Sequence, residues 1–277
     1  MLDLIDEIQL KGDGFLKWIG SKKWLKKEIL FLISKISPNN YHEPFLGSGA
    51  IFFSKKSQKS FLNDINSDLI TTYLVVRENP NDLVEKLNEL EQSERMFYQI
   101  REKKPISNLE IATRFIYLNK TSFNGLYREN KSGEFNASYG KRQFNIRTIS
   151  NQILSSSNLL QNVELTSVDF SETISNVKEN DLVFLDPPYS ISEGEGFTRY
   201  NRELFSENDQ KRIIKYIEEV KKRKAFYILT NEYNDNSVGL LSVLEDKTLI
   251  ANRKSVISGD INGRKLYREL IVTNIAQ

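Results

Sequence analysis

The chain of 277 residues has no cysteine and a single histidine, His42. Cysteine-ligated zinc, iron–sulfur clusters, disulfides and cysteine nucleophiles are therefore impossible, and a Ser-His-Asp triad would have to use His42 itself. No apolar run approaches the roughly 20 residues that cross a bilayer. The first seven residues are acidic and lack the basic region of a secretory signal. The sequence therefore predicts a cytoplasmic protein without a membrane segment, whose chemistry uses neither thiols nor a metal.

The net charge is small as well, at +2, but the basic residues are unevenly placed. They gather in residues 11–27, 120–147 and 253–268, and in the second of these segments they alternate with aromatic residues. Any one basic segment alone is ordinary solvated surface, whereas clustered bases with interleaved aromatics are typical of nucleic-acid binding. The pattern predicts a face that binds a polyanion.

The most informative short motif follows an apolar run at residues 182–185, which predicts a buried strand. The next residues are Asp186, Pro187, Pro188 and Tyr189. A carboxylate and a backbone carbonyl here could accept both N–H bonds of an amino group conjugated to a ring, and orient it toward a methyl donor. The prolines stiffen the loop, and the tyrosine offers a flat face for an extruded base. These four residues are the predicted catalytic loop; a plain Pro-Pro turn is the alternative.

A second motif, E-P-F-L-G-S-G at residues 43–49, combines a strand end, a glycine turn and a helix start. Glycines let the backbone approach a ligand, and a helix N-terminus favours negative charge. Asp64 ends the next strand 17 residues after Gly47, close to the roughly 20-residue spacing at which an acid binds ribose hydroxyls. Upstream, Lys22 is suited to a ligand carboxylate and Trp18 to its apolar part. A nucleoside ligand smaller than NAD is predicted, because the full dinucleotide fingerprint is absent.

The order of predicted elements favours an α/β protein with an insertion. Strands and helices alternate over residues 25–66 as a βαβ unit, which favours a parallel sheet. Residues 67–162 are mostly helical in pattern, apart from a Gly/Asn-rich stretch at 121–147 that predicts a long loop or hairpin. Strands are predicted again at 163–168, 182–185, 225–230 and 269–272, and Ser206 with Asp209 predicts a helix start.

Taken in order, these motifs resemble the Dam-type adenine DNA methyltransferases, the alpha group of amino-methyltransferases. The matching segments are F-L-K-W-I-G-S-K, E-P-F-L-G-S-G, N-D-I-N-S-D-L-I, F-N-G-L-Y-R-E-N-K-S-G-E-F-N, D-P-P-Y, F-T-R-Y and R-K-S-V-I-S, and they run nearly end to end. The resemblance implies a Rossmann-like α/β sheet that uses S-adenosylmethionine, with an inserted helical target-recognition domain. Residues 1–66 and 163–277 would form the catalytic domain, and residues 67–162 the DNA-recognition domain.

The resemblance also implies roles for individual residues. The expected cofactor-binding residues are Trp18, Lys22, Phe45, Gly47, Gly49, Asp64, Asp169, Phe170 and Asp186. The expected DNA-binding residues are Phe123, Asn124, Leu126, Arg128, Asn136, Ser138, Lys141 and Arg142. Arg128 is the expected bidentate contact to guanine, and Phe123 or Leu126 the expected wedge between bases. Ser138 and Lys141 stand where GATC enzymes usually carry proline and arginine, so a related sequence containing GA competes with GATC.

Several alternatives remain at this point. The acceptor could be the 4-amino group of cytosine or a glutamine amide, and a DNA-binding relative without activity is a third possibility. Methylation at carbon 5 of cytosine is excluded because it needs a cysteine nucleophile. The expected partners are double-stranded DNA and, in a restriction–modification system, an endonuclease acting on the same site. A monomer is expected.

Overall fold

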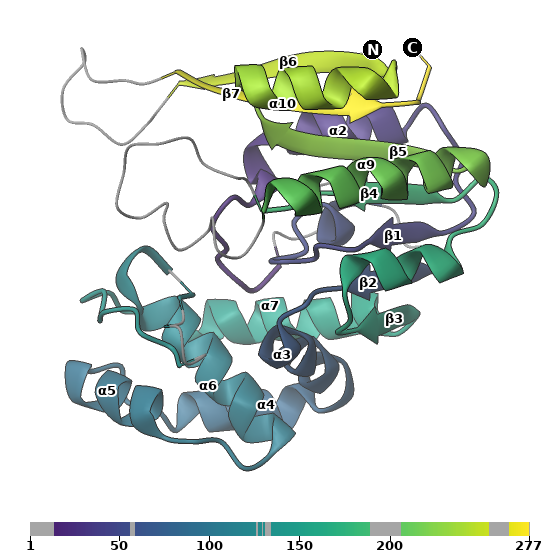
Figure 1. Ribbon diagram of the computed structural model, residues 1–277. Coiled ribbons are helices and arrows are strands. Elements are labelled where there is room, and N and C mark those ends of the chain that lie inside the picture. Colours follow the sequence, from purple (N-terminus) through teal and green to yellow (C-terminus); the bar gives the residue numbers. More distant parts are fainter. Residues whose placement is uncertain are drawn as a thin grey trace. The chain divides into compact units, whose positions relative to one another are not determined.

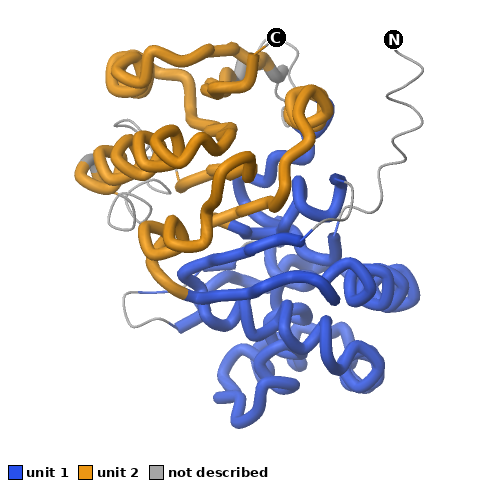
Figure 2. The backbone as a smooth tube through the Cα atoms, turned by 90° about the vertical axis from the view of Figure 1, so that its right-hand side faces the viewer, with its two compact units in different colours: residues 1–27, 46–167 blue, residues 28–45, 168–277 orange. Residues whose placement is uncertain are grey.

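The computed structural model describes residues 14–55, 59–125, 127–128, 130, 134–188, 206–254 and 266–276. The chain divides into two compact units (Figure 2). Unit 1 comprises Met1–Lys27 and Leu46–Ser167, and unit 2 comprises Glu28–Phe45 and Val168–Gln277. These units are defined by packing. The division into a catalytic and a DNA-recognition domain concerns function and stays a prediction.

Unit 1 is a helical cluster attached to a short parallel strand pair (Figure 1). Its elements are η1 (Lys22–Leu25), η2 (Phe52–Ser54), β2 (Ser60–Asn63), α3 (Ser67–Glu78), α4 (Pro80–Asn88), α5 (Glu94–Glu102), α6 (Asn108–Thr121), η3 (Phe123–Gly125), α7 (Ile146–Leu160) and β3 (Val163–Thr166). In the strand pair, Ser60 lies opposite Val163 and Asn63 opposite Thr166. The helix expected to start near Ala50 is only the 3-10 turn η2, because Lys55 is extended and ends it.

Helix starts in unit 1 follow directly from the sequence. The side chains of Asn66, Ser93, Ser107 and Asn145 each accept a hydrogen bond from a first-turn amide. Such caps satisfy amides that have no partner within the helix, and each stabilises it by about 1 kcal/mol. Helix α3 packs against α6 and α7, and α4 packs against the same two helices. The predicted helical character of residues 67–162 is therefore confirmed.

The Gly/Asn-rich segment after α6 forms a hairpin-like loop in its described residues. Ser122 and Tyr139 form an antiparallel bridge, and the Gly140 amide donates to the Thr121 carbonyl at 2.8 Å. A Cβ atom on Gly140 would lie 2.5 Å from the Ser122 carbonyl oxygen, so no other residue fits without a backbone shift. Farther along, the Asn136 amide donates to the Arg128 carbonyl, also at 2.8 Å. The predicted loop or hairpin is confirmed.

Unit 2 contains an open mixed sheet with the order β1-β4-β5-β7-β6. Helix α2 (Lys26–Ile33) begins in unit 1 and continues into unit 2. The other elements of unit 2 are β1 (Tyr41–Glu43), η4 (Phe170–Asn176), β4 (Leu182–Leu185), α9 (Glu207–Lys222), β5 (Phe226–Glu232), α10 (Asp235–Leu241), η5 (Ser242–Leu244), β6 (Lys247–Lys254) and β7 (Leu266–Thr273). Strands β1, β4 and β5 are parallel, whereas β7 runs antiparallel to both β5 and β6. The predicted α/β class is confirmed.

Helix α9 and the neighbouring strands build the core of unit 2. Ser206 and Asp209 form the predicted capping box, with reciprocal side-chain and backbone hydrogen bonds. Ile213, Ile217 and Val220 of the helix are buried in one cluster with apolar residues of β4, β5 and β7. This packing fixes β4, whose carboxyl end carries the predicted catalytic loop.

Candidate active site

The glycine turn of unit 1 requires glycine at its first position. Gly47 has a φ of 48°, in the left-handed region that favours glycine. A Cβ atom there would lie 2.7 Å from Cδ1 of Trp18, so the indole packs directly against the turn. The Tyr73 hydroxyl donates to the Gly47 carbonyl at 2.9 Å and holds the turn from its buried side. The structure therefore brings two predicted cofactor-binding residues into contact, while Gly49, with a φ of 63°, completes the same turn.

Asp64 belongs to the same cluster. Its Oδ2 atom accepts a hydrogen bond from the Gly47 amide at 2.9 Å, and its Oδ1 atom accepts one from the Asn66 amide at 3.0 Å. Burial raises the pKa of the Asp64 carboxyl, although both amides act in the opposite direction. The carboxylate thus lies at the glycine turn, as the sequence spacing predicts.

Trp18 also connects the turn to the helical cluster. Its ring stacks at 6.3 Å from Phe115 and 5.9 Å from Tyr127, measured between ring centroids. Lys22, predicted to pair with a ligand carboxylate, is buried, and its ammonium donates to the Gly20 carbonyl at 2.8 Å. The ammonium therefore stabilises the loop that carries Trp18.

In unit 2, the predicted catalytic loop follows β4 directly. Asp186 is half-buried, Pro187 is buried and Pro188 is exposed, while Tyr189 lies outside the described residues. The Thr230 hydroxyl, on β5, donates to Oδ1 of Asp186 at 2.9 Å. Sequence reasoning missed this threonine, because its importance depends on the pairing of two strands.

A second acid lies at the end of β1. The buried Tyr41 hydroxyl donates to Oε2 of Glu43 at 2.8 Å. Burial, Glu43 and the charge of Asp186 together raise the pKa of Tyr41 well above its usual value. The tyrosine therefore stays protonated and remains a donor to Glu43 across the physiological pH range.

Asp169 and Phe170 lie at the start of η4, with Asp169 as its cap. The Asp169 carboxylate forms an ion pair with Arg212 of α9, and the guanidinium lies 4.7 Å from the centroid of the Phe170 ring. Burial acts to raise the pKa of Asp169, but hydrogen bonds from Ser171 and Arg212 outweigh it and lower the pKa. Phe45, the remaining predicted cofactor-binding residue, packs 5.1 Å from Phe170 between ring centroids.

The predicted DNA-binding residues lie on the hairpin-like loop of unit 1. Arg128 donates to Asn136 twice, from Nε to the side-chain oxygen at 2.6 Å and from Nη2 to the carbonyl at 3.1 Å. Phe123 is 56% exposed, so its apolar ring faces solvent. The other described members of this set, Asn124, Ser138, Lys141 and Arg142, are also exposed. Leu126 lies outside the described residues.

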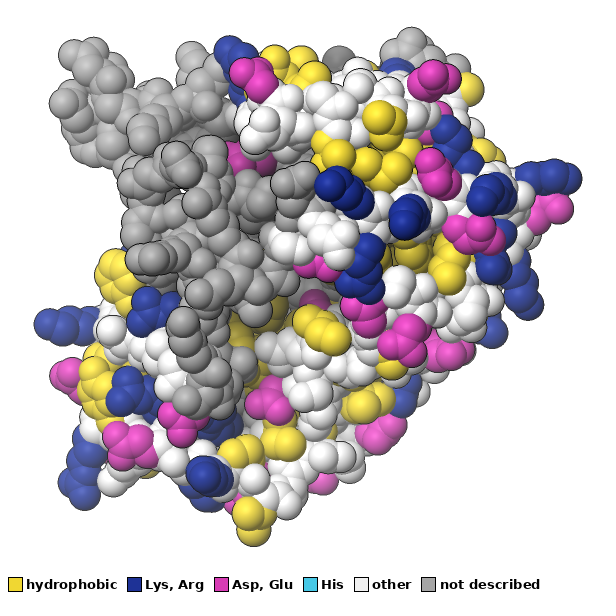
Figure 3. All heavy atoms as spheres, viewed as in Figure 1, with side chains coloured by type: hydrophobic (Ala, Val, Ile, Leu, Met, Phe, Trp, Pro, Cys, Tyr) yellow, Lys and Arg dark blue, Asp and Glu magenta, His cyan; other side chains and the backbone are white. Residues whose placement is uncertain are grey.

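Basic residues also lie near one another at the end of α6. Lys120 is 7% exposed, and burial followed by the charges of Lys17 and Lys23 lowers its pKa to about 8. Elsewhere, on the face shown in Figure 3, the described basic side chains are interspersed with acidic ones. The expected polyanion-binding face is therefore not a continuous basic patch among the described residues of this view.

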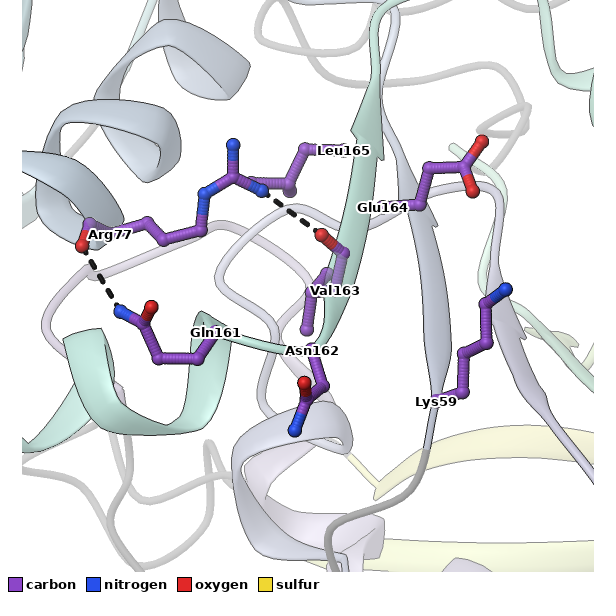
Figure 4. A pocket seen from close by; sticks show the side chains of 7 residues that line it. All are labelled: Lys59, Arg77, Gln161, Asn162, Val163, Glu164 and Leu165. Atoms are coloured by element: carbon purple, nitrogen blue, oxygen red, sulfur yellow. Dashed lines mark hydrogen bonds between the residues drawn. The ribbon is translucent and has the colours of Figure 1, made fainter.

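A hollow of about 680 Å³ in unit 1 lies beside the first residues of β3 (Figure 4). Arg77 Nη1 donates to the Val163 carbonyl at 3.0 Å, and Gln161 Nε2 donates to the Arg77 carbonyl at 3.2 Å. Ligands of open α/β sheets bind at the carboxyl ends of the strands, whereas this hollow lies where β3 begins. We interpret it as a surface hollow left where the Arg77 hydrogen bonds connect α3 to β3, and not as a ligand site.

Unit 1 thus carries the predicted glycine turn, and unit 2 carries the predicted Asp-Pro-Pro corner directly after β4. Residues 18–260 match the family model described as D12 class N6 adenine-specific DNA methyltransferase, and the chain belongs to this family. The predicted enzyme class, adenine specificity and Dam-type resemblance are thereby confirmed. The two alternative acceptors, the cytosine 4-amino group and a glutamine amide, are left without support.

Individual relatives agree with this assignment. The chain is 31% identical to a type II methyltransferase of Lactococcus lactis subsp. cremoris, covering 99% of each protein. It is 33% identical to a type II methyltransferase of Methanocaldococcus jannaschii, over 94% of this chain and 98% of that protein. The DNA adenine methylase of Escherichia coli (strain K12) is 29% identical, over 80% of this chain and 81% of that protein. None of the helices in the described part of the chain has the length and hydropathy of a bilayer-crossing segment.

Proposed function

We propose that this enzyme transfers a methyl group from S-adenosylmethionine to the 6-amino group of adenine in duplex DNA, at GATC or a related sequence containing GA. The observation that carries the proposal is the position of Asp186. Its half-buried carboxylate directly follows a fully buried strand and precedes two prolines. A carboxylate held on a rigid strand end is suited to orienting a weakly nucleophilic amine.

The residues of the glycine turn fit the proposed donor. Gly47 carries no side chain, Trp18 packs against it, and Asp64 provides a carboxylate beside it for ribose hydroxyls. When bound, S-adenosylmethionine would supply an electrophilic methyl group on a sulfonium. The residues proposed to hold it are Trp18, Lys22, Phe45, Gly47, Gly49, Asp64, Asp169, Phe170 and Asp186.

The proposed catalytic work of the protein is orientation. Asp186 and the Pro187 carbonyl accept the two N–H bonds of the amino group, which leaves the nitrogen lone pair directed away from them. Pro188 cannot donate a backbone hydrogen bond, so the corner presents acceptors only. Tyr189 is proposed to stack on the adenine after it has been rotated out of the helix.

The hairpin-like loop is proposed to read the DNA sequence. Arg128 would contact guanine in the major groove, a contact that contributes roughly 1–3 kcal/mol of discrimination. The exposed ring of Phe123 would support the flipped state. In this proposal residues 67–162 act as the recognition domain, and the enzyme works as a monomer. The type II relatives support a restriction–modification context with a partner endonuclease.

The test is expression in a methylation-free host, followed by nucleoside analysis and modification-sensitive sequencing of the genome. We expect 6-methyladenine at a single GA-containing motif, and the motif itself decides between GATC and its relatives. Asp186→Ala should abolish methylation and retain DNA binding, while the exposed Asp235→Ala should stay active. A fully active Asp186→Ala enzyme would contradict the proposed role of the acidic corner.

A further inference from the structure

Strand register places a buried hydroxyl at the predicted catalytic carboxylate. Leu185, the last residue of β4, pairs with Leu229 of β5 in parallel register. Asp186, the first residue after β4, therefore comes next in register with Thr230 of β5. The Thr230 hydroxyl donates to Oδ1 of Asp186 at 2.9 Å. The contact is thus a direct consequence of how the two strands align.

Thr230 itself has little freedom. Its side chain is 0% exposed, and it lies on a strand paired on both sides, with Ile271 of β7 opposite it on the antiparallel side. A β-branched residue in this setting has a restricted χ1 angle. The position of the Thr230 hydroxyl is therefore fixed, whereas the Asp186 carboxylate beside it is only half-buried.

An ordinary buried threonine would donate to a backbone carbonyl, and one is within reach. The Leu185 carbonyl oxygen lies 3.3 Å from the Thr230 hydroxyl, compared with 2.9 Å for Oδ1 of Asp186. A threonine hydroxyl has one proton, and a hydrogen bond to an ionised acceptor is about twice as strong as one between neutral groups. The carboxylate is therefore the preferred acceptor. The neighbouring acid, Glu43, has its own hydroxyl donor in Tyr41.

We propose that Thr230 is a positioning residue for methyl transfer, whose hydroxyl fixes the rotation of the Asp186 carboxylate so that Oδ2 is presented to the target amino group. The inference rests on the proposed role of Asp186. Rotation about the last torsion of aspartate is broad when nothing restrains it. A hydrogen bond from a rigid strand to one oxygen narrows that distribution toward the orientation that an in-line displacement requires.

The test compares variants that differ only in the hydroxyl. Thr230→Val keeps the shape and removes the donor, and Thr230→Ser restores the donor. Thr273→Val is the matched control, because Thr273 is equally buried and its hydroxyl donates to a carbonyl on the same sheet, that of Tyr227. Steady-state and single-turnover methylation of a cognate duplex, DNA affinity and thermal unfolding are measured for each.

We expect Thr230→Val to lower kcat by about 10- to 100-fold, the cost of a misplaced catalytic group, with KM and DNA affinity unchanged. Thr230→Ser and Thr273→Val should keep nearly full kcat, even where they lower the unfolding temperature. A folded Thr230→Val enzyme with normal kcat would overturn the inference, as would an equal loss of kcat in Thr273→Val.

If Thr230→Val does not fold, Thr230→Ser and Thr230→Ala provide a second pair that again differs by the hydroxyl alone. A serine enzyme that is much faster than the alanine enzyme supports the inference, and equal rates overturn it. Asp186→Ala, assayed alongside, distinguishes a failure of the Thr230 role from a failure of the proposed function. If Asp186→Ala is inactive while Thr230→Val is normal, only the role of Thr230 fails; an active Asp186→Ala removes the proposed function itself.

Discussion

The Gly47 amide donates to Oδ2 of Asp64 at 2.9 Å, although the two residues are 17 positions apart in the sequence. One carboxylate therefore holds the glycine turn and, under the proposed function, would also bind the ligand. It satisfies the glycine turn and lies where ribose hydroxyls are expected to bind. Because burial raises the pKa of this carboxyl, its ionised form depends on the two amides that donate to it.

Asp64→Asn should weaken both functions of the carboxylate. The asparagine amide group would direct N–H donors toward the Asn66 amide or the Gly47 amide, and an unmatched donor costs about 1–3 kcal/mol. Calorimetry should show weaker binding of S-adenosylmethionine, and urea unfolding should show a lower free energy of unfolding. The exposed Asp82→Asn in the first turn of α4 provides the control; it should leave the affinity for S-adenosylmethionine unchanged and lower the unfolding free energy by about 1 kcal/mol at most. Unchanged affinity for the donor in Asp64→Asn would contradict the ribose-binding role.

Gly47→Ala should destabilise the protein and displace Trp18. The alanine would adopt a φ of 48° and place its Cβ atom 2.7 Å from the indole, a combination that costs on the order of 1–3 kcal/mol. Gly239→Ala is the matched control, because nothing lies within 4 Å of its added Cβ atom in α10. That variant should be neutral or slightly more stable, since alanine favours helix. Equal unfolding free energies of the two variants would refute the steric argument.

Stability should fall at acidic pH through Asp181. This buried residue accepts hydrogen bonds from His42 at 2.8 Å, from Lys178 at 2.9 Å and from Asn40. Burial acts to raise the pKa of Asp181, but these hydrogen bonds outweigh it and lower the pKa. A lowered folded-state pKa contributes stability above the unfolded value of about 3.9, which is lost as the pH falls through the folded-state value.

Asp181→Asn isolates this contribution. The variant should be less stable at neutral pH, and its unfolding free energy should change less than that of the wild type below about pH 4. Urea unfolding at a series of pH values provides the measurement. Asp82→Asn serves again as the exposed control. If the unfolding free energy of Asp181→Asn falls as steeply at acidic pH as that of the wild type, other carboxylates cause the loss of stability.

Arg128→Lys should relax sequence discrimination while keeping the charge. Lysine cannot reproduce the two parallel contacts of a guanidinium to guanine, which are worth about 1–3 kcal/mol. The ratio of kcat/KM between the cognate duplex and one with the guanine replaced should therefore shrink about 10-fold or more. Arg95→Lys, at an exposed position on α5, provides the control. If Arg128→Lys retains full discrimination, another residue reads the guanine.

The sequence predicted some elements well because local signals agreed with the tertiary environment. Strand β4 has the predicted bounds, since an apolar run lies between Asp181 and Asp186, and α9 starts at its capping box. Strand β6 was not predicted, because it mixes polar and apolar residues and Ile250 in it is 52% exposed. Thr230 was missed for a different reason. A lone threonine in a strand has no pattern, and only the β4–β5 register shows what it touches.

The close approach of Gly140 to Ser122 has a consequence for how such an enzyme can diversify. The base of the hairpin tolerates no extra carbon atom, whereas Ser138, Lys141 and Arg142 nearby are exposed and lie outside the packed interior. If these residues read bases as proposed, exchanges at the exposed positions would alter the recognised sequence without disturbing the packed base of the hairpin. Under the proposed function, a few surface substitutions would then be enough to change the target sequence, provided that Gly140 stays in place.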